Sequence, residues 1–225
     1  MSRLQIRIQL LSDTTFGRGD GVAGLVDQEV EHDAYGFPYL RGRTLKGLLR
    51  EECENLIAVL PTYQLDWLDI AYRLFGEPGS ELSSKGILHV GDACLPQDLR
   101  AAVAKQIDID AGQLTKTDIL NSLTTIRRQT SIEALSGVPD KGSLRSARVI
   151  VRELELLANL DFEQEPTDAM KSLIAVGTLA LRYVGSGRHR GRGHVRCTLH
   201  DTDGNDVTAQ HTEMFGKELK STEGA

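Results

Sequence analysis

The clearest feature of the sequence is a set of segments in which apolar and polar residues alternate. The first covers residues 3–11, and its apolar positions are Leu4, Ile6, Ile8 and Leu10. Such alternation is typical of a strand with one buried face. Further strands are expected at residues 86–95, 146–162 and 194–201.

Helical spacing of apolar residues predicts four helices between these strands. They cover residues 44–60, 65–75, 97–107 and 167–184. Thr44 is a candidate N-cap of the first helix, and Pro166 is well placed to open the last one. Gly185 then ends that helix, because glycine readily adopts the left-handed conformation found after helix C-termini. Residues 77–85 are rich in Gly, Pro and Ser and are expected to form a loop.

The order of these elements indicates an α+β fold. Without residues 107–147, the chain runs strand, helix, strand, strand, helix, strand, which is the ferredoxin-like order of RNA-recognition domains. The polar insertion follows the second strand. It contains a strand at 124–135 and a turn at 136–143, and this predicts a protruding hairpin. We expect one domain over residues 1–200, followed by an acidic extension or loose tail over residues 201–225.

Composition restricts the class of protein. The 225 residues carry a formal net charge of −6, which argues against non-specific coating of nucleic acid but permits a local basic groove. The three cysteines are far apart and form no CxxC pair, so neither a zinc ribbon nor a disulfide framework is expected. No signal peptide or membrane span is evident. These features favour a cytoplasmic protein without a membrane partner.

A glycine-rich basic run, "GSGRHRGRGHVR", begins at residue 185. It follows a helix and precedes a strand, the reverse of a Rossmann fingerprint, and it lacks the GK[ST] ending of a P-loop. Two interpretations remain: a flexible exposed loop, or a clamp whose backbone N–H groups and arginines bind phosphate. The candidate RNA-binding residues are Gly185, Ser186, Gly187, Arg188, His189, Arg190, Gly191 and Arg192.

Two further basic groups could extend that site. One lies on the first helix and consists of Arg41, Arg43, Thr44, Lys46 and Arg50, where the cationic residues recur at helical spacing. By itself this group also fits a solvated helix face. The other lies on the insertion and the strand after it, and consists of Arg127, Arg128, Lys141, Arg145, Arg148 and Arg152. Together the groups predict a long site for single-stranded or guide nucleic acid.

Acidic residues alternate in the segment "LVDQEVEHD". Its carboxylates are Asp27, Glu29, Glu31 and Asp33. In an extended chain they share one face, which could hold a divalent metal. For Glu29 and Glu31 we favour a solvated strand edge. Asp27 differs, because it follows an apolar stretch and leads toward the basic helix.

The histidines show no metal-binding or catalytic spacing. The six histidines form no HxH or HExxH pattern, and no serine or cysteine triad is indicated by the order of residues. His189 and His194 are expected at the phosphate or the surface rather than at a metal.

These motifs together resemble the RAMP superfamily, and more narrowly the backbone subunits of type III CRISPR effector complexes. The resemblance rests on "GVAGLVDQEV", "HDAYGFPYLRGRTLKGLLR", "RLFG" and "GSGRHRGRGHV", in that order, between about residues 4 and 200. The second of these is the most specific. Arg41 stands where the family has a proline, and Glu133 departs from the family's hairpin motif.

The resemblance implies a stack of subunits along a guide RNA, with a target-cleaving site in each. Asp27 matches the family's catalytic aspartate, which acts with a divalent metal such as Mg²⁺ or Mn²⁺. The partners implied are guide and target RNA, neighbouring RAMP subunits and a large signature subunit. The insertion at about 107–147 matches the family's thumb in location but not in contacts, and the candidate thumb residues are Arg127, Arg128, Ile132 and Arg145.

Two alternatives remain beside an RNA-guided nuclease. One is a non-catalytic RNA-binding subunit that spaces or caps the same kind of complex, because a sequence cannot establish that Asp27 is correctly placed. The other is a guide-processing ribonuclease. That enzyme class relies on histidine for acid–base chemistry, and His32 is the only N-terminal histidine in the chain.

Overall fold

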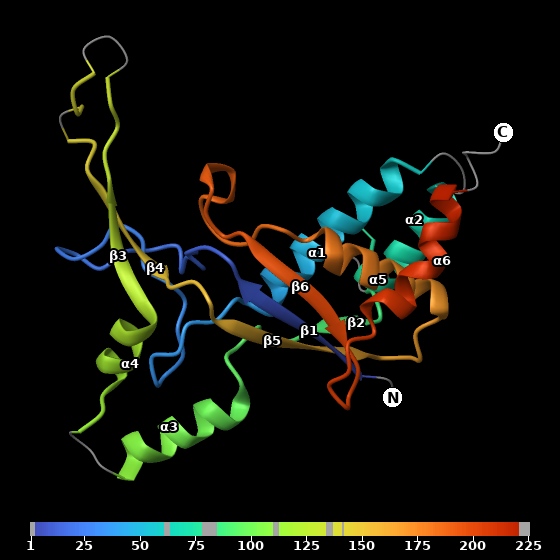
Figure 1. Ribbon diagram of the computed structural model, residues 1–225, viewed down its shortest axis with the longest axis horizontal. Helices are drawn as coiled ribbons and strands as arrows, with labels where there is room; N and C mark the ends of the chain where they lie inside the picture. The colour runs from blue at the N-terminus through green and yellow to red at the C-terminus, as the bar shows by residue number, and fades with distance from the viewer. Residues whose placement is uncertain are drawn as a thin grey trace.

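A four-stranded antiparallel sheet forms the centre of the protein (Figure 1). The computed structural model describes residues 3–60, 64–77, 85–109, 113–133, 137–140 and 142–220. The strands are β1 (Arg3–Leu10), β2 (Leu88–Val90), β5 (Glu155–Phe162) and β6 (Val195–His200). Their order in the sheet is β2-β5-β1-β6, which is the ferredoxin-like arrangement. The predicted α+β class is confirmed.

Two helices cover one face of this sheet and create the core. They are α1 (Gly42–Ala58) and α5 (Asp168–Ala180). The alternating apolar residues of β1 are buried against them, as the sequence pattern predicts. The helices approach closely at Gly177, where a Cβ atom would lie only 2.4 Å from Cys53 Sγ. Only glycine therefore permits this packing without a shift of the helices.

The insertion between β2 and β5 carries two helices and a separate two-stranded sheet. Its elements are α3 (Gln97–Ile109), α4 (Lys116–Leu123), β3 (Thr124–Gln129) and β4 (Arg145–Ile150). The β3–β4 hairpin is antiparallel and projects from the body (Figure 1). Its predicted position is confirmed. Helix α4 was not predicted, although Thr115 and Asp118 form a capping box at its start.

The C-terminal segment is not a loose tail. Residues Thr208–Lys220 form α6, which packs beside α5. Phe215 of α6 is buried, and its ring meets Trp67 edge to face at a centroid distance of 4.7 Å. Trp67 belongs to α2 (Gln64–Phe75), the predicted second helix. Aromatic burial of this kind attaches the acidic segment to the core.

Three predicted boundaries are wrong. Helix α1 begins at Gly42, whose N–H donates to Asp92 Oδ1 at 2.7 Å, so Thr44 is not the N-cap. Helix α5 ends at Ala180 rather than at Gly185. The alternating segment 146–162 is two strands in different sheets, separated at Glu153, whose φ is 70°.

Most of the loop predicted at 77–85 lies outside the described residues. No helix in the described part of the chain is long and apolar enough to cross a membrane.

Candidate nucleic-acid interface

The glycine-rich loop is the tip of a small hairpin between α5 and β6. Its base is closed by a backbone bond from Val184 to Gly193 (2.9 Å) and by the stacked rings of Tyr183 and His194. Gly193 has a φ of +70°, and a Cβ atom there would lie 1.9 Å from the Val184 carbonyl oxygen. Glycine at position 193 thus permits the closed base of the loop, because any side chain there would meet the Val184 carbonyl.

Four cavities surround this loop, and loop residues connect them. Their volumes are about 570, 240, 550 and 210 Å³. Ser186 lines the first and second, Arg190 the first and third, and Arg192 the first and fourth. The predicted clamp residues therefore face a continuous series of hollows rather than one closed pocket.

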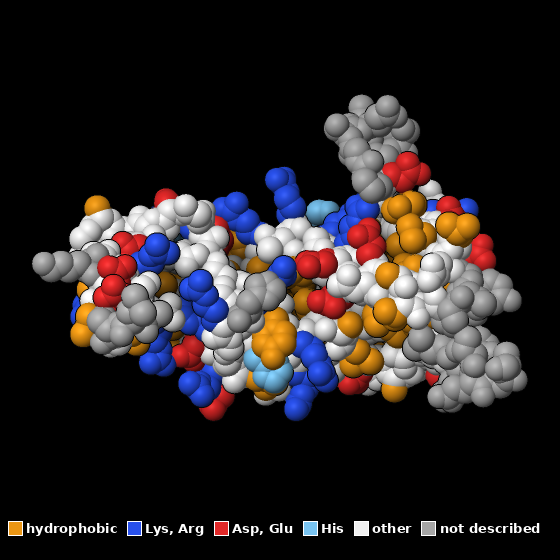
Figure 2. Space-filling model, turned by 90° about the horizontal axis from the view of Figure 1, so that it is seen from above, with side chains coloured by type: hydrophobic (Ala, Val, Ile, Leu, Met, Phe, Trp, Pro, Cys, Tyr) orange, Lys and Arg blue, Asp and Glu red, His pale blue; other side chains and the backbone are white. Residues whose placement is uncertain are grey.

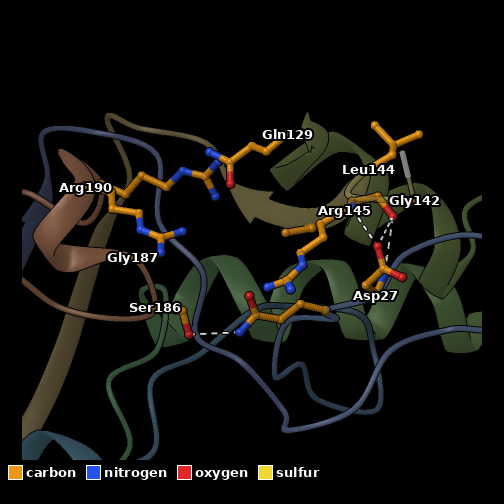
Figure 3. Close-up of a pocket in the computed structure, with 12 residues that line it drawn as sticks. Asp27, Gln129, Gly142, Leu144, Arg145, Ser186, Gly187 and Arg190 are labelled. Carbon is orange, nitrogen blue, oxygen red and sulfur yellow. Dashed lines mark hydrogen bonds between the residues drawn. The ribbon is translucent and has the colours of Figure 1, made fainter. Parts of the chain in front are cut away.

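The largest cavity lies between the loop, the base of the hairpin and the segment that carries Asp27 (Figure 3). Arg145 of β4 and Arg190 of the loop extend into it from opposite sides. Gln129, at the end of β3, also lines it. Figure 2 shows that Lys and Arg side chains are frequent over the hairpin end and the centre of this face, whereas the helical end carries more apolar ones. Such a surface suits an extended polyanion.

Asp27 is exposed at the rim of that cavity and is attached to β4. Its Oδ2 accepts hydrogen bonds from the backbone N–H of Ser146 at 2.6 Å and from the Ser146 hydroxyl at 3.0 Å. These bonds hold the pKa of the Asp27 carboxyl below its usual range. Asp27 is therefore an anion at neutral pH, and the charge of Arg145 also lowers its pKa. Ser146 was not predicted as a site residue.

The thumb residues proposed from the sequence lie in different places. Arg145 lines the largest cavity. Arg127 lines the fourth and pairs with Asp13 at 2.8 Å. Arg128 is exposed on β3, and Ile132 lies beyond β3 with 67% of its surface exposed. Only Arg127 and Arg145 thus belong to the cavities around the loop.

Only some of the basic residues at the start of α1 lie near the glycine-rich loop. Arg41 and Thr44 line the second cavity together with loop residues, while Arg43 is exposed on the helix. Lys46 donates to the Leu88 carbonyl oxygen at 2.7 Å, and burial lowers its pKa. Arg50 pairs with Glu54 at 2.7 Å. The structure thus brings the helix N-terminus, and not the whole predicted face, to the glycine-rich loop.

The remaining basic residues of the insertion have different surroundings. Arg148 is buried, so it cannot contact RNA as the sequence grouping suggested. Arg152 lies beside the fourth cavity and shares Asp13 with Arg127. Burial raises the pKa of Asp13, but the bonds from the two arginines outweigh it and the pKa is lowered. Lys141 lies outside the described residues.

The acidic segment is neither a solvated edge nor a metal-binding stripe. Glu29 is buried against Arg148, with Oε1 2.9 Å from the guanidinium Nε. Glu31 is also buried and lies 2.7 Å from Arg41, while Asp33 pairs with Arg100 at 2.8 Å. The favoured interpretation of Glu29 and Glu31 is therefore wrong: both are internal partners of arginine.

The expected divalent metal finds few protein ligands. Within the described residues no group of three or more His, Cys, Asp or Glu side chains could hold a metal ion. Asp27 offers a single carboxylate, one oxygen of which is already bonded to Ser146. The described residues by themselves do not form a metal centre, so an ion at Asp27 would need further ligands from a bound molecule.

The histidines contribute little to the site. His194 packs on Tyr183, with ring centroids 5.2 Å apart. The Nδ1 atom of His32 lies 3.1 Å from the Asp33 carbonyl oxygen, and His32 lines none of the four cavities around the loop. The side chain of His189 lies outside the described part of the loop. The geometry gives no support to a histidine-based ribonuclease.

Comparison with known proteins agrees with this architecture. A model of the RAMP superfamily matches residues 7–196. A chain in the cryo-EM structure of a type III-B Cmr-beta complex bound to cognate target RNA matches with a TM-score of 0.62 and 13% identity, over 88% of this chain and 97% of that one. A chain of the apo complex matches with a TM-score of 0.61 and 14% identity, over the same shares of the two chains, 88% and 97%. No curated protein matches the sequence.

Proposed function

The chain belongs to the RAMP superfamily, and on that basis we propose that it is an RNA-guided backbone subunit of a type III CRISPR interference complex. In this proposal it binds guide RNA and cleaves the complementary target RNA. Its partners are the two RNAs, neighbouring RAMP subunits and a large signature subunit. The shared fold with subunits of a type III-B complex, one of which was captured with target RNA, supports the assignment.

The observation that carries the proposal is the meeting of three segments around one cavity. Arg190 and Arg192 come from the glycine-rich loop, Arg145 from the hairpin, and Asp27 from the segment after β1. Arginines on two sides can bind successive phosphates, while base pairing with the guide selects the sequence. In this proposal the phosphodiester held by these arginines passes the Asp27 carboxylate at the rim of the same cavity.

Cleavage would proceed by attack of a ribose 2′-oxygen on the adjacent phosphorus. The new P–O bond forms as the bond to the 5′-oxygen breaks; the 2′-hydroxyl proton passes to solvent and the departing 5′-oxygen takes a proton from water, which leaves a 2′,3′-cyclic phosphate and a free 5′-hydroxyl. Both bonds from Ser146 reach Oδ2 of Asp27, so Oδ1 is the oxygen that can accept a hydrogen bond from the attacking hydroxyl. A carboxylate with a lowered pKa is a weak base, so orientation is its main contribution.

The arginines beside Asp27 would stabilise the charge that develops on the phosphoryl oxygens. A divalent ion, Mg²⁺ or Mn²⁺, remains part of the proposal. It would neutralise charge at the same phosphate, with Asp27 as its protein ligand and RNA oxygens as the rest.

The test is a single substitution in the assembled complex. Asp27→Asn removes the charge and keeps the shape, and we expect target cleavage at this subunit's position to fall by about 100-fold to 10,000-fold. Binding of labelled target should be unchanged. Asp20→Asn is the matched control, because Asp20 is an exposed carboxylate in the same loop that pairs with Arg18 at 2.7 Å and does not line the cavity.

A second candidate is the non-catalytic spacer or capping subunit. It is favoured by one observation, the two bonds from Ser146, because they give Asp27 a structural reason to be there. If Asp27→Asn cleaves like the native complex, or if the native complex binds target without cutting it, this candidate replaces the first. Absence of RNA co-purifying with the complex would count against both.

A further inference from the structure

Below the candidate site lies a buried ion pair that the proposed chemistry does not use. The side chains of Glu29 and Arg148 are only 3% and 7% exposed. The Arg148 Nε atom lies 2.9 Å from Oε1 and 3.1 Å from Oε2 of Glu29. A terminal nitrogen of the same guanidinium donates to Asn121 at 3.2 Å and to Thr124 at 3.1 Å. Arg148 thus joins the segment after β1 to both α4 and β3.

The segment after β1 is also bonded to β4 through the two backbones. The N–H of Asp27 donates to the Ser146 carbonyl at 2.9 Å, and the N–H of Arg148 donates to the Gln28 carbonyl at 2.9 Å. Gln28 and Ala147 form a parallel bridge. Asp27 therefore sits opposite Ser146 in a short parallel ladder, and Glu29 and Arg148 lie next along it.

The contact with β4 is a single isolated bridge, although the backbones of Glu29 and Glu31 also bond the Asp27 segment to residues 16–20. A slip by one residue turns every side chain of a strand to the opposite face. An apolar pair at positions 29 and 148 would tolerate a slip, since apolar contacts are not directional. A buried carboxylate or guanidinium that lost its partner would instead be strongly destabilising. The ion pair consequently adds a penalty against any other register.

A gain in stability explains the presence of this buried ion pair less well than a role in specifying one arrangement does. Desolvation of two charges offsets much of their attraction, and well-packed apolar residues often replace buried ion pairs without loss of stability. The best-attested use of a buried polar group is to specify one arrangement among several. Here the arrangement specified is the one that brings Asp27 to Ser146.

We propose that Glu29 and Arg148 are positioning residues that lock the register of the Asp27 segment on β4. They touch no RNA, and they act through the ladder by holding the Asp27 carboxylate at the rim of the cavity. The link from this lock to cleavage rests on the function proposed above, whereas the lock itself does not. The two claims can therefore be tested separately.

The informative variant replaces both charges, Glu29→Leu with Arg148→Met, so that no unpaired charge remains buried. We expect it to fold and to melt near the native temperature. In the free subunit, amide hydrogen exchange should become at least about tenfold faster at residues 27–29 and 146–148, because the ladder is no longer held in one register. Exchange in β1 and β5 should stay as slow as in the native protein.

In the assembled complex, the same double variant should bind target with native affinity and cleave it about 100-fold more slowly, since a displacement of about 1 Å costs roughly this factor. If the double variant does not fold, Glu29→Gln with the same two measurements takes its place. Arg100→Met is the control, because it breaks the neighbouring Asp33–Arg100 pair (2.8 Å) on α3. It should leave both exchange in the ladder and cleavage unchanged.

If the amides of residues 27–29 and 146–148 exchange in the double variant at the native rate, the proposed lock is overturned, whatever the rate at which that variant cleaves target. Faster exchange with native cleavage would limit the pair to a structural role and overturn positioning. A native complex that does not cut target would remove the proposed nuclease activity, and the exchange result would then decide the lock by itself.

Discussion

The glycine-rich loop and the acidic segment at residues 27–33 both carry like charges at alternating positions, yet the fold uses them in opposite ways. The arginines of the loop line cavities. The acids of the segment lie against three other elements: Asp27 and Glu29 contact β4, Glu31 contacts Arg41 before α1, and Asp33 contacts α3. Most of the loop's arginines face cavities, although Arg188 also pairs with Glu51 of α1 at 3.5 Å, whereas the acids of the segment mainly hold other parts of the molecule in place.

The difference follows from what flanks each run. Glycines surround the arginines, and glycine has no side chain to bury, so the loop stays at the surface. Val26 and Val30 flank Glu29 in the acidic segment, and both are buried. Burial of these apolar neighbours also brings the acids close to the core, where each carboxylate needs a cationic or N–H partner. Charge patterns are therefore best interpreted together with the residues between the charges.

The largest effect should come from Arg148→Met alone. Glu29 would stay buried without its partner, and loss of one member of such a pair costs about 3–5 kcal/mol of stability. Arg190→Met, on the loop, should cost less than about 0.5 kcal/mol. Urea unfolding of both variants measures the contrast. Equal stabilities would mean that the two runs of charge are not used differently.

Next in size is a backbone effect within the loop. Gly193→Ala places a Cβ atom 1.9 Å from the Val184 carbonyl oxygen at a φ of +70°, and should cost about 3 kcal/mol. Gly191→Ala is the control, since its φ is +76° but nothing lies within 4 Å of the added Cβ. It should cost about 1 kcal/mol. Similar melting temperatures for the two variants would contradict the closed base of the loop.

A smaller effect is expected on RNA binding rather than on stability. Arg190→Ala with Arg192→Ala should weaken guide binding and flatten its dependence on salt by about 0.7 in log–log slope for each phosphate that the loop no longer binds. Arg73→Ala with Lys105→Ala removes the same charge from exposed positions on α2 and α3, and should leave the slope unchanged. An unchanged slope in the loop variant would remove the loop from the interface.

The smallest effect concerns acid stability. The pKa of Asp13 is lowered in the folded protein, so its contribution is present above the ordinary pKa of about 3.9 and is lost as pH falls through the folded value. Since Arg127 and Arg152 are more than half exposed, the contribution should be below about 1 kcal/mol. Asp13→Asn should make the free energy of unfolding fall less steeply as pH is lowered from about 5 to about 2. If the free energy of unfolding of the variant depends on pH as steeply as that of the native protein, Asp13 is not a stabilising partner of these arginines.

Periodicity predicted those elements that bury one face against the central core. This holds for β1, β6 and most of α1, and for the position of the β3–β4 hairpin. It did not separate β4 from β5, because the break at Glu153 leaves the alternation almost intact. It also missed α6, whose burial depends on Phe215 meeting Trp67 more than a hundred residues away in sequence.

At the candidate site, the sequence proposed the loop arginines and Asp27, which the structure brings to one cavity, but it did not show how they are held. Ser146 and Gln129 are uncharged polar residues with no motif of their own, and only the fold brings them to the cavity. Glu29 was misjudged, because alternation shows which residues share a face but not whether that face is covered. The one available signal was Arg148 beside Val149 and Ile150, a cation in an otherwise apolar run.

The attachment of residues 27–29 to β4 also determines what could be exchanged between related proteins. A chimera that received only a foreign hairpin would lose Ser146 and Arg148 and would retain the carboxylates that depend on them. The smallest transferable module therefore combines residues 12–33 with residues 116–152, two stretches far apart in the gene. Recombination or design that divides this module should leave Glu29 buried without its cationic partner and release the Asp27 carboxylate from Ser146.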